Sequence, residues 1–359
     1  MVSDASSSTL LNALGLRVPI VQAPMAGTSS PAMAAAVSNS GGLGSLGVGA
    51  MTAVKAREAI HAFRQSSKGP LNINVFSHQP AHADEAKQAA WLARLAPEFE
   101  RFGAKAPSSI GEIYTSFLVD DDMLAMLVTE RPAVVSFHFG VPTSSQIEAL
   151  HGAGIYLMGT ATNLDEANAF EAAGIDAIVA QGYEAGGHRG MFDPDADDGR
   201  LGTFALTRLL VKNMRVPVIA AGGIMDGAGI AAALTLGAAA AQLGTAFVVT
   251  DESLADAGYR NAMASDAARH TVMTRAVSGR PARSLASLFT RLGSEVSDPQ
   301  VPDYPIAYDA GKALNAAGRA KGEAGYGAHW AGQGAPLARP MSARALMETL
   351  IAEWEHASH

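Results

Sequence analysis

The chain has 359 residues, with 26 basic and 34 acidic side chains, a formal net charge of −8, 48% hydrophobic residues and no cysteine. The acidic balance, without a block of Lys and Arg, argues against nucleic acid and a membrane surface as partners. The lack of cysteine excludes disulfides, Cys-ligated metal centres and a thiolate nucleophile. Any redox chemistry therefore requires a cofactor that needs no thiolate.

The first residues lack the basic and apolar regions of a signal peptide, so we expect a cytoplasmic protein. A later stretch, Gly227 to Thr250, carries no charge and is long enough to raise the question of a membrane span. It is rich in Ala and Gly and contains Gln242 and Thr245. A helix followed by a buried strand of an α/β core explains it better.

Short apolar runs alternate with Ala-rich stretches along the first two thirds of the chain. The predicted strands are 18–22, 43–48, 71–76, 133–138, 155–159, 177–181, 216–221 and 239–244. The predicted helices between them are 31–40, 52–65, 144–151, 164–173, 204–212 and 226–236. This alternation predicts an α/β fold, a (β/α)8 TIM barrel, with a doubly wound open sheet as the alternative.

Two segments depart from the alternation. Residues 81–131 are too long for one crossover and are expected to form at least two helices. Residues 253–326 are charged, helical and interrupted by prolines, which predicts an inserted helical lid over the substrate. We therefore expect a barrel formed by 1–252 and 327–359 and a lid formed by 253–326. The barrel part would end in an amphipathic helix with Leu346, Leu350 and Trp354 on one face.

Glycines at predicted strand ends suggest two kinds of nucleotide site. The run Gly42-Leu43-Gly44-Ser45-Leu46-Gly47 has the letters of a dinucleotide fingerprint. It follows a predicted helix and forms a strand itself, without an acid about 20 residues on, so we reject that reading. Gly222-Gly223 and Gly244-Thr245 follow predicted strands seven and eight, where barrels frequently bind phosphate through backbone N–H groups. Tight turns are the alternative.

Two histidines follow predicted strands. His188 lies in a loop from Gln181 to Gly190 that contains four glycines, and it is our candidate for catalysis. An imidazole near neutral pH can accept a proton or stabilise an anion. His138 ends the fourth strand, with a structural role as the alternative. No histidine has metal-ligand spacing with acids, so no metal site is predicted.

Tyr304, Tyr308 and Lys312 recur every four residues, so on a helix beginning near Pro305 they would share one face. Two phenols and an ammonium group suit an anion such as a carboxylate or nitronate. An amphipathic surface with half-buried tyrosines is the alternative.

Together these motifs resemble the nitronate monooxygenases, formerly called 2-nitropropane dioxygenases, over nearly the whole chain. The resemblance lies in Gln22-Ala23-Pro24-Met25-Ala26-Gly27, Asn72-Ile73-Asn74, the loop 181–190, Ala221-Gly222-Gly223-Ile224, Gln242-Leu243-Gly244-Thr245 and Trp330-Ala331-Gly332-Gln333-Gly334. It implies an FMN-dependent (β/α)8 barrel that holds FMN non-covalently.

The resemblance also implies roles for individual residues. Cofactor contacts would come from Ala23, Pro24, Met25, Asn74, Gln181, Gly186, Gly187, Gly222, Gly223, Gln242, Leu243, Gly244 and Thr245. His188 would be the active-site histidine beside the flavin. Substrate would meet His138, Tyr114, Tyr259, Tyr304, Tyr308 and Lys312, as in the bacterial class that prefers propionate 3-nitronate.

The implied activity is oxidation of an anionic alkyl nitronate with O2 to an aldehyde, malonic semialdehyde for propionate 3-nitronate, plus nitrite or nitrate. Such an enzyme would detoxify a metabolic poison, as a monomer or homodimer. The alternatives are an NAD(P)H-dependent FMN reductase of the quinone or enoyl type, a flavin-free aldolase or isomerase barrel, and a flavin carrier.

Overall fold

The protein is described by a computed structural model that covers residues 9–295 and 300–358. Its centre is a barrel of eight parallel strands: β1 (Ile20–Gln22), β2 (Gly44–Gly47), β3 (Leu71–Phe76), β4 (Val134–His138), β5 (Tyr156–Ala161), β6 (Ala177–Gln181), β8 (Val218–Ala221) and β9 (Ala240–Leu243). The strands pair in the order β2-β3-β4-β5-β6-β8-β9-β1. A parallel bridge between Val21 and Leu43 closes the ring. The predicted TIM barrel is confirmed, and the open sheet is excluded.

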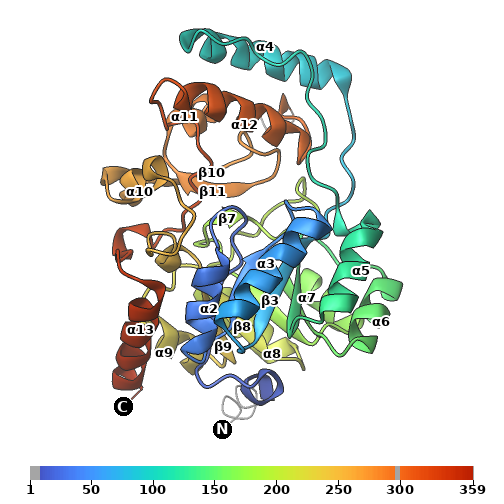
Figure 1. Ribbon diagram of the computed structural model, residues 1–359, viewed down its shortest axis with the longest axis vertical. Helices are drawn as coiled ribbons and strands as arrows, with labels where there is room; N and C mark the ends of the chain where they lie inside the picture. The colour runs from blue at the N-terminus through green and yellow to red at the C-terminus, as the bar shows by residue number, and fades with distance from the viewer. Residues whose placement is uncertain (1–8, 296–299, 359) are drawn as a thin grey trace.

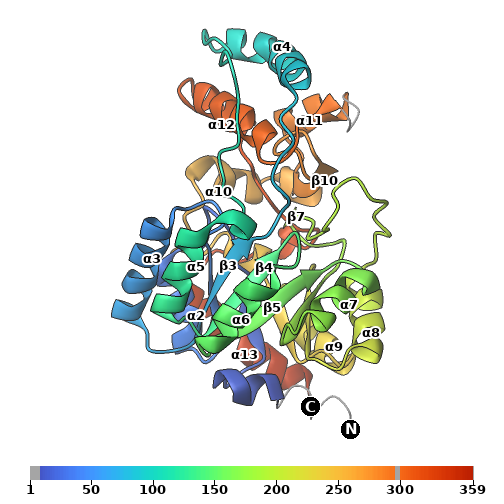
Figure 2. The same ribbon diagram turned by 90° about the vertical axis from the view of Figure 1, so that its right-hand side faces the viewer.

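Helices surround the barrel, as Figure 1 and Figure 2 show. They are α2 (Pro31–Asn39), α3 (Ala53–Ser66), α5 (Asp121–Glu130), α6 (Ser144–Gly152), α7 (Leu164–Ala172), α8 (Thr203–Asn213) and α9 (Gly227–Thr235). Side chains just before the helices fix their starts, because Ser30, Thr52 and Asn163 each accept a hydrogen bond from a first-turn N–H group. The six predicted barrel helices are present, with ends within one residue of those expected.

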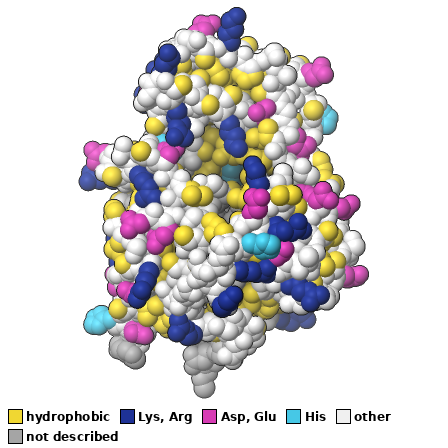
Figure 3. All heavy atoms as spheres, in the orientation of Figure 1, with side chains coloured by type: hydrophobic (Ala, Val, Ile, Leu, Met, Phe, Trp, Pro, Cys, Tyr) yellow, Lys and Arg dark blue, Asp and Glu magenta, His cyan; other side chains and the backbone are white. Residues whose placement is uncertain are grey.

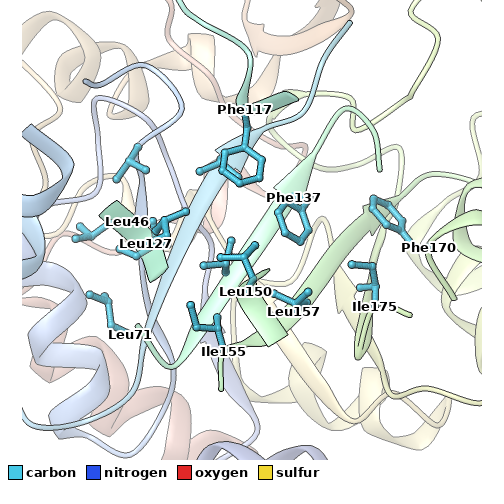
Figure 4. Packing of buried hydrophobic residues seen from close by; sticks show 14 of the residues in the cluster. Leu46, Leu71, Phe117, Leu127, Phe137, Leu150, Ile155, Leu157, Phe170 and Ile175 are labelled. Carbon is cyan, nitrogen blue, oxygen red and sulfur yellow. The ribbon is translucent and has the colours of Figure 1, made fainter. Parts of the chain in front are cut away.

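Apolar side chains pack on both sides of the strands. Outside, Phe137 and Leu157 point from the sheet toward helix residues such as Leu150 and Phe170 (Figure 4). Inside, Leu10 and Leu14 from the N-terminal segment pack with the buried Val134, Met158 and Ile219 of the strands, among others. The lower end of the barrel is therefore filled, which leaves the carboxyl ends of the strands for a site.

The chain returns to the barrel in α13 (Ala343–Ala357), which packs against α9 and α2. Leu346 and Leu350 are fully buried and Trp354 is partly buried, so the predicted amphipathic face is confirmed. The uncharged stretch from Gly227 to Thr250 contains α9 and the buried strand β9, as expected. Within the described ranges, no helix is long and apolar enough to cross a membrane.

The predicted lid covers the carboxyl ends of the barrel strands, but it is not purely helical. It contains α10 (Ala257–Met263), α11 (Leu288–Ser294), α12 (Ile306–Arg319) and the strands β10 (Thr271–Thr274) and β11 (Ala282–Leu285). The strands form an antiparallel sheet with β7 (Gly187–His188), which comes from the loop after β6. β-Branched residues in β10 favour a strand that is too short to show periodicity in the sequence.

The insertion at 81–131 forms α4 (Glu85–Arg101), a short 3-10 turn and α5, in agreement with the prediction of at least two helices. Both ribbon views place α4 above α12 (Figure 1, Figure 2). Trp91 and Phe99 of α4 share an apolar cluster with Leu314 of α12. Lys87 pairs with Asp303 at 3.5 Å. We call α4 and residues 253–326 together the cap. The expected boundary at residue 253 assigned α4 to the barrel, whereas its apolar face packs on the lid.

Candidate active site

A cavity of about 420 Å³ lies between the carboxyl ends of the barrel strands and the cap. Figure 3 shows the surface hollowed at this level, with hydrophobic side chains visible inside. The cavity wall includes every predicted site residue except Leu243. It also includes residues that we did not predict, among them Gly47, Met51, Phe76, Ser136, Thr160 and Trp330. Of these six, Gly47 lies in the rejected dinucleotide fingerprint and Trp330 lies in the motif at residues 330–334.

Leu243 is absent from the wall because of strand alternation. Gln242 and Gly244 line the cavity, whereas Leu243 and Ala241 point outward into the core beside α9 and α13. The Leu243 carbonyl accepts a hydrogen bond from the Ala23 N–H group at 2.8 Å. Leu243 therefore supports the turn after β1 without facing the cavity.

The turn after β1 is shaped by the buried side chain of Gln22. Its Oε1 accepts a hydrogen bond from the Ser45 N–H group at 2.9 Å, and its Nε2 donates to the Ser29 hydroxyl at 2.9 Å. The same hydroxyl accepts from the Met25 N–H group at 3.0 Å. These bonds hold residues 23–29 against the end of β2, so Ala23, Pro24 and Met25 form one side of the cavity.

Glycines after β8 and β9 expose backbone to the cavity. Gly222 and Gly223 have φ values of 115° and 72°, a region that residues with side chains rarely adopt. In the described part of the chain, no hydrogen bond uses the N–H group of Gly222, Gly223 or Gly244. Such unused N–H groups after barrel strands seven and eight suit a phosphate.

The loop that carries His188 is held mainly by Gln181. The Gln181 Nε2 donates to the His188 carbonyl at 2.8 Å, and its Oε1 accepts from the Gly190 N–H group at 2.8 Å. The Nε2 of His138 lies 3.2 Å from the same His188 carbonyl and acts as its second donor. Gln181 and His138 therefore line the cavity and also position the backbone of His188.

The His188 side chain lies among rings from both the barrel and the cap. Its centroid is 5.0 Å from the Trp330 ring and 5.4 Å from the Tyr304 ring, and its Nε2 lies 2.8 Å from the Ser278 Oγ. Burial, with smaller contributions from His138 and Arg280, lowers the pKa of His188 to about 3. His188 is therefore a neutral imidazole at physiological pH.

Arg280, which no motif indicated, places a cation behind this site. Its side chain is buried, lies over the Phe139 ring at 4.4 Å and donates to the carbonyls of Met191 and Phe192. The Phe139 ring also contacts His188 edge to face. Burial lowers the pKa of Arg280 to about 10, so the guanidinium stays charged near neutral pH. Its charge disfavours protonation of His188 and favours anions in the cavity.

The cap side of the cavity is aromatic. Lys312 on α12 places its Nζ 4.7 Å from the Tyr114 ring centroid and 5.5 Å from that of Tyr308. α12 begins at Ile306, so Tyr304 reaches the cavity from the turn before the helix, a correction to the expected common helical face. Proline cannot donate a helical hydrogen bond, and Pro305 lies at the N-cap.

The tyrosine hydroxyls differ in their partners. The Tyr304 hydroxyl is buried and has no hydrogen-bond partner among the described residues, whereas the Tyr259 hydroxyl donates to the Trp330 carbonyl. Burial raises the pKa of Tyr308 to about 12, so this phenol remains a neutral donor. The Tyr308 hydroxyl accepts a hydrogen bond from the Trp330 indole. Tyr304 and Tyr308 thus each keep a hydroxyl proton that can be donated to a ligand, and Tyr259 supports Trp330.

A TIM barrel with a capped cavity at the carboxyl ends of its strands, unused backbone N–H groups and a buried histidine is an enzyme of the α/β barrel class. The sequence matches the family model described as nitronate monooxygenase over residues 7–353. The chain therefore belongs to the nitronate monooxygenase family and is an oxidoreductase.

Individual relatives agree with this assignment. The chain is 62% identical over 353 residues to a nitronate monooxygenase of Paraburkholderia phytofirmans, covering 98% of this chain and 96% of the relative. It is 51% identical to a nitronate monooxygenase of Pseudomonas aeruginosa, covering 95% and 97%. A solved structure of nitroalkane oxidase from Streptomyces ansochromogenes is similar, with a TM-score of 0.87, 41% identity and coverage of 98% and 99%. FabK from Thermotoga maritima has a TM-score of 0.73, 30% identity and coverage of 97% and 96%.

Proposed function

We propose that the protein oxidises anionic alkyl nitronates with FMN and O2, and that propionate 3-nitronate is its preferred substrate. The products would be malonic semialdehyde and nitrite or nitrate, in a detoxifying role. The observation that carries this proposal is the division of one cavity into unused backbone N–H groups on one side and tyrosines with an ammonium group on the other. This arrangement suits a phosphorylated flat cofactor facing a small dianion.

The residues on the barrel side fit FMN. The N–H groups of Gly222, Gly223 and Gly244 would hold its single phosphate, since all three glycines line the cavity. The turn at Ala23–Met25 and Asn74 would lie along the flavin ring. The Asn74 Nδ2 donates to Ser136, which orients the amide in the wall. When bound, FMN would supply the electron-accepting chemistry that no side chain of this cysteine-free protein offers.

The residues around His188 would handle the substrate. A neutral His188 would hydrogen-bond a nitronate oxygen, and the buried Arg280 cation would favour the negative charge. Lys312, Tyr304, Tyr308 and Tyr114 would bind the carboxylate of propionate 3-nitronate. The cap would exclude bulk water from the space between them.

The proposal is tested with the purified protein in an oxygen electrode. Propionate 3-nitronate should drive rapid O2 consumption, and heat-released cofactor should run as FMN in chromatography. No O2 consumption with any alkyl nitronate, or FAD in place of FMN, would contradict it. A cytoplasmic location, a monomer or homodimer, and the division into barrel and lid domains stay predictions.

The second candidate is an NAD(P)H-dependent FMN reductase, favoured by the similarity to FabK over nearly the whole chain. Under anaerobic conditions, NADH should bleach the flavin of such a reductase within seconds. A nitronate oxidase should instead be bleached by the nitronate and remain yellow with NADH.

A further inference from the structure

His188 belongs to the barrel and to the cap at the same time. Its carbonyl is held by Gln181 and His138 from barrel strands. Its backbone also forms part of β7, where His188 pairs antiparallel with Ala282 and Gly187 pairs with Arg283 of β11. The cap thus reaches the candidate catalytic residue directly, through the sheet of β10, β11 and β7.

Ser278, in the turn between β10 and β11, reaches the His188 side chain. Its side chain is fully buried and its Oγ lies 2.8 Å from the His188 Nε2. The turn is rigidly placed: the N–H groups of Ser278 and Gly279 both donate to the Arg275 carbonyl. Gly279 has φ 95°, and a Cβ there would come within 2.5 Å of the Pro302 carbonyl oxygen. The backbone of Ser278 is therefore held in place by the packing of this turn.

The distances indicate where the single hydroxyl proton of Ser278 goes. Among the described residues, the Oγ has two possible hydrogen-bond acceptors, the His188 Nε2 at 2.8 Å and the Arg280 carbonyl oxygen at 3.4 Å. The first distance is typical of a hydrogen bond, and the second lies beyond the usual range. The shorter distance favours donation of the Ser278 hydroxyl to Nε2, which must be unprotonated to accept. A neutral imidazole then carries its proton on Nδ1.

The other ring nitrogen of His188 is left for a ligand. Among the described residues, the bond to Ser278 is the only hydrogen bond made by the imidazole, and the side chain lines the cavity. A nitronate has already lost its acidic C–H proton, so it needs a donor toward its oxygens and no base. The assignment of a nitronate as the ligand of this nitrogen rests on the proposed function.

We propose that Ser278 is a positioning residue that holds His188 as the Nδ1–H tautomer, so that a neutral imidazole donates a hydrogen bond to a nitronate oxygen. Arg280 acts in the same direction, because its charge near the ring opposes a second proton. The serine selects which nitrogen carries the proton, and the arginine keeps the number of protons at one.

The tautomer is tested directly by NMR of holoenzyme labelled with ¹⁵N-histidine, with His188 assigned by comparison with His188→Asn. We expect a protonated, pyrrole-type Nδ1 signal and an unprotonated Nε2 signal for His188. Ser278→Ala should mix the two tautomers. A wild-type spectrum with the proton on Nε2 would overturn the proposal, whatever the activity.

Kinetics provide the second readout. Ser278→Ala should lower kcat/KM for propionate 3-nitronate by about 10-fold, the scale of one neutral hydrogen bond and a partly populated tautomer, with flavin content unchanged. Ser278→Thr restores the hydroxyl and should recover most of the loss. If the extra methyl prevents folding in this tight turn, Ser278→Cys, a weaker donor, should give an intermediate value.

Ser284→Ala is the matched control. Ser284 is equally buried in β11 of the same sheet, and its Oγ donates one hydrogen bond, to the His329 carbonyl at 3.0 Å. This variant should keep the His188 tautomer and stay within twofold of wild-type kcat/KM. Equal losses in both variants would mean that Ser278 acts only through cap stability, and would overturn the proposal. A wild-type enzyme with the expected tautomer but no activity on nitronates would instead refute the proposed function alone.

Discussion

The barrel side of the cavity presents backbone and small residues, whereas the cap side presents aromatic rings and an ammonium group. Gly222, Gly223 and Gly244 line the first side, and Tyr114, Tyr308 and Lys312 line the second. Backbone N–H groups recognise a phosphate in the same way whatever the rest of the ligand is. Tyrosine and lysine side chains can be exchanged without disturbing a strand. Under the proposed function, cofactor binding and substrate choice are therefore separable, and substitutions on each side should have different effects.

The largest effect is expected for Gly223→Asp, which should abolish flavin binding. The residue has φ 72°, and the new carboxylate would enter the proposed phosphate site and repel the phosphate. The measurement is the ratio of flavin to protein from absorbance after reconstitution. Gly174→Asp is the control, because Gly174 has a similar φ of 87° and open space around it. Full flavin content in Gly223→Asp would contradict the proposed position of the phosphate on the barrel side of the cavity.

The next largest effect is expected for His188→Asn, on the residue that joins the two sides. The variant should keep FMN and lower kcat/KM for propionate 3-nitronate by roughly 100-fold, the scale of a positioned polar group at the reacting atoms. His138→Asn should lose less, because His138 supports the loop through the His188 carbonyl. Steady-state O2 consumption measures both. Near wild-type turnover of His188→Asn would make His188 a structural residue.

A smaller, selective effect is expected for Lys312→Met. It should raise KM for propionate 3-nitronate by about 10-fold and largely spare ethyl nitronate, which has no carboxylate. A charge-assisted hydrogen bond is worth roughly 1.5 to 3 kcal/mol. We expect the lower part of that range because Lys312 is exposed and solvent screens its charge. Equal losses for both substrates would place Lys312 at the nitronate group or in cap folding.

The smallest effect on turnover is expected from pH. His188 has a pKa lowered to about 3, so it is neutral from pH 5.5 to 8, and kcat/KM should show no histidine step near pH 6.5 in that range. A clear loss of activity centred near pH 6.5 would mean that His188 titrates normally and lies in water. Oxygen consumption in buffers of constant ionic strength measures this.

The free energy of unfolding should nevertheless depend on pH, because two further buried histidines change their protonation when the protein unfolds. Burial lowers the pKa of both His78 and His138 to about 4, from 6.5 in the unfolded chain. Below pH 6.5 these two histidines are therefore protonated in the unfolded chain but stay neutral in the folded protein. The free energy of unfolding therefore falls as pH falls toward 4. Each such histidine should cost about 2 kcal/mol between pH 6.5 and 5. His78→Gln should reduce the pH slope of the unfolding free energy, and an unchanged slope would contradict the burial of a neutral His78.

The barrel could be predicted from the sequence because its strands are buried runs and most of its helices begin at a capping side chain, as at Thr52 and Asn163. The position of α4 could not, because Trp91 shares its apolar cluster with Leu314, which lies more than 200 residues later in the chain. Leu243 was assigned to the site by motif, although the alternation along β9 directs it outward. Its neighbour Gln242 belongs to the same motif and does line the cavity. Motif and strand alternation together therefore predict the cavity-lining residues better than the motif alone.

Motifs and the family resemblance indicated many of the cavity-lining residues, but they did not indicate Ser278 and Arg280 behind them. Ser278 and Arg280 act through a turn whose course depends on β10 and β11, which are too short to predict. A lone serine and a lone arginine in a charged segment have no distinguishing spacing. Their roles become visible only when β11 is paired with β7, because that pairing fixes which side chains meet His188.

The pairing of β7 with β11 limits how this enzyme can be redesigned. Replacing residues 253–326 as a block with the corresponding segment of another barrel would remove β11, the strand that pairs with the backbone of His188, together with Ser278. Exchanging only Ile306–Arg319 would alter Tyr308 and Lys312 and leave that strand intact. A library aimed at new substrates should therefore graft α12 alone, and chimeras of the whole lid should retain β11 and its preceding turn from the parent chain.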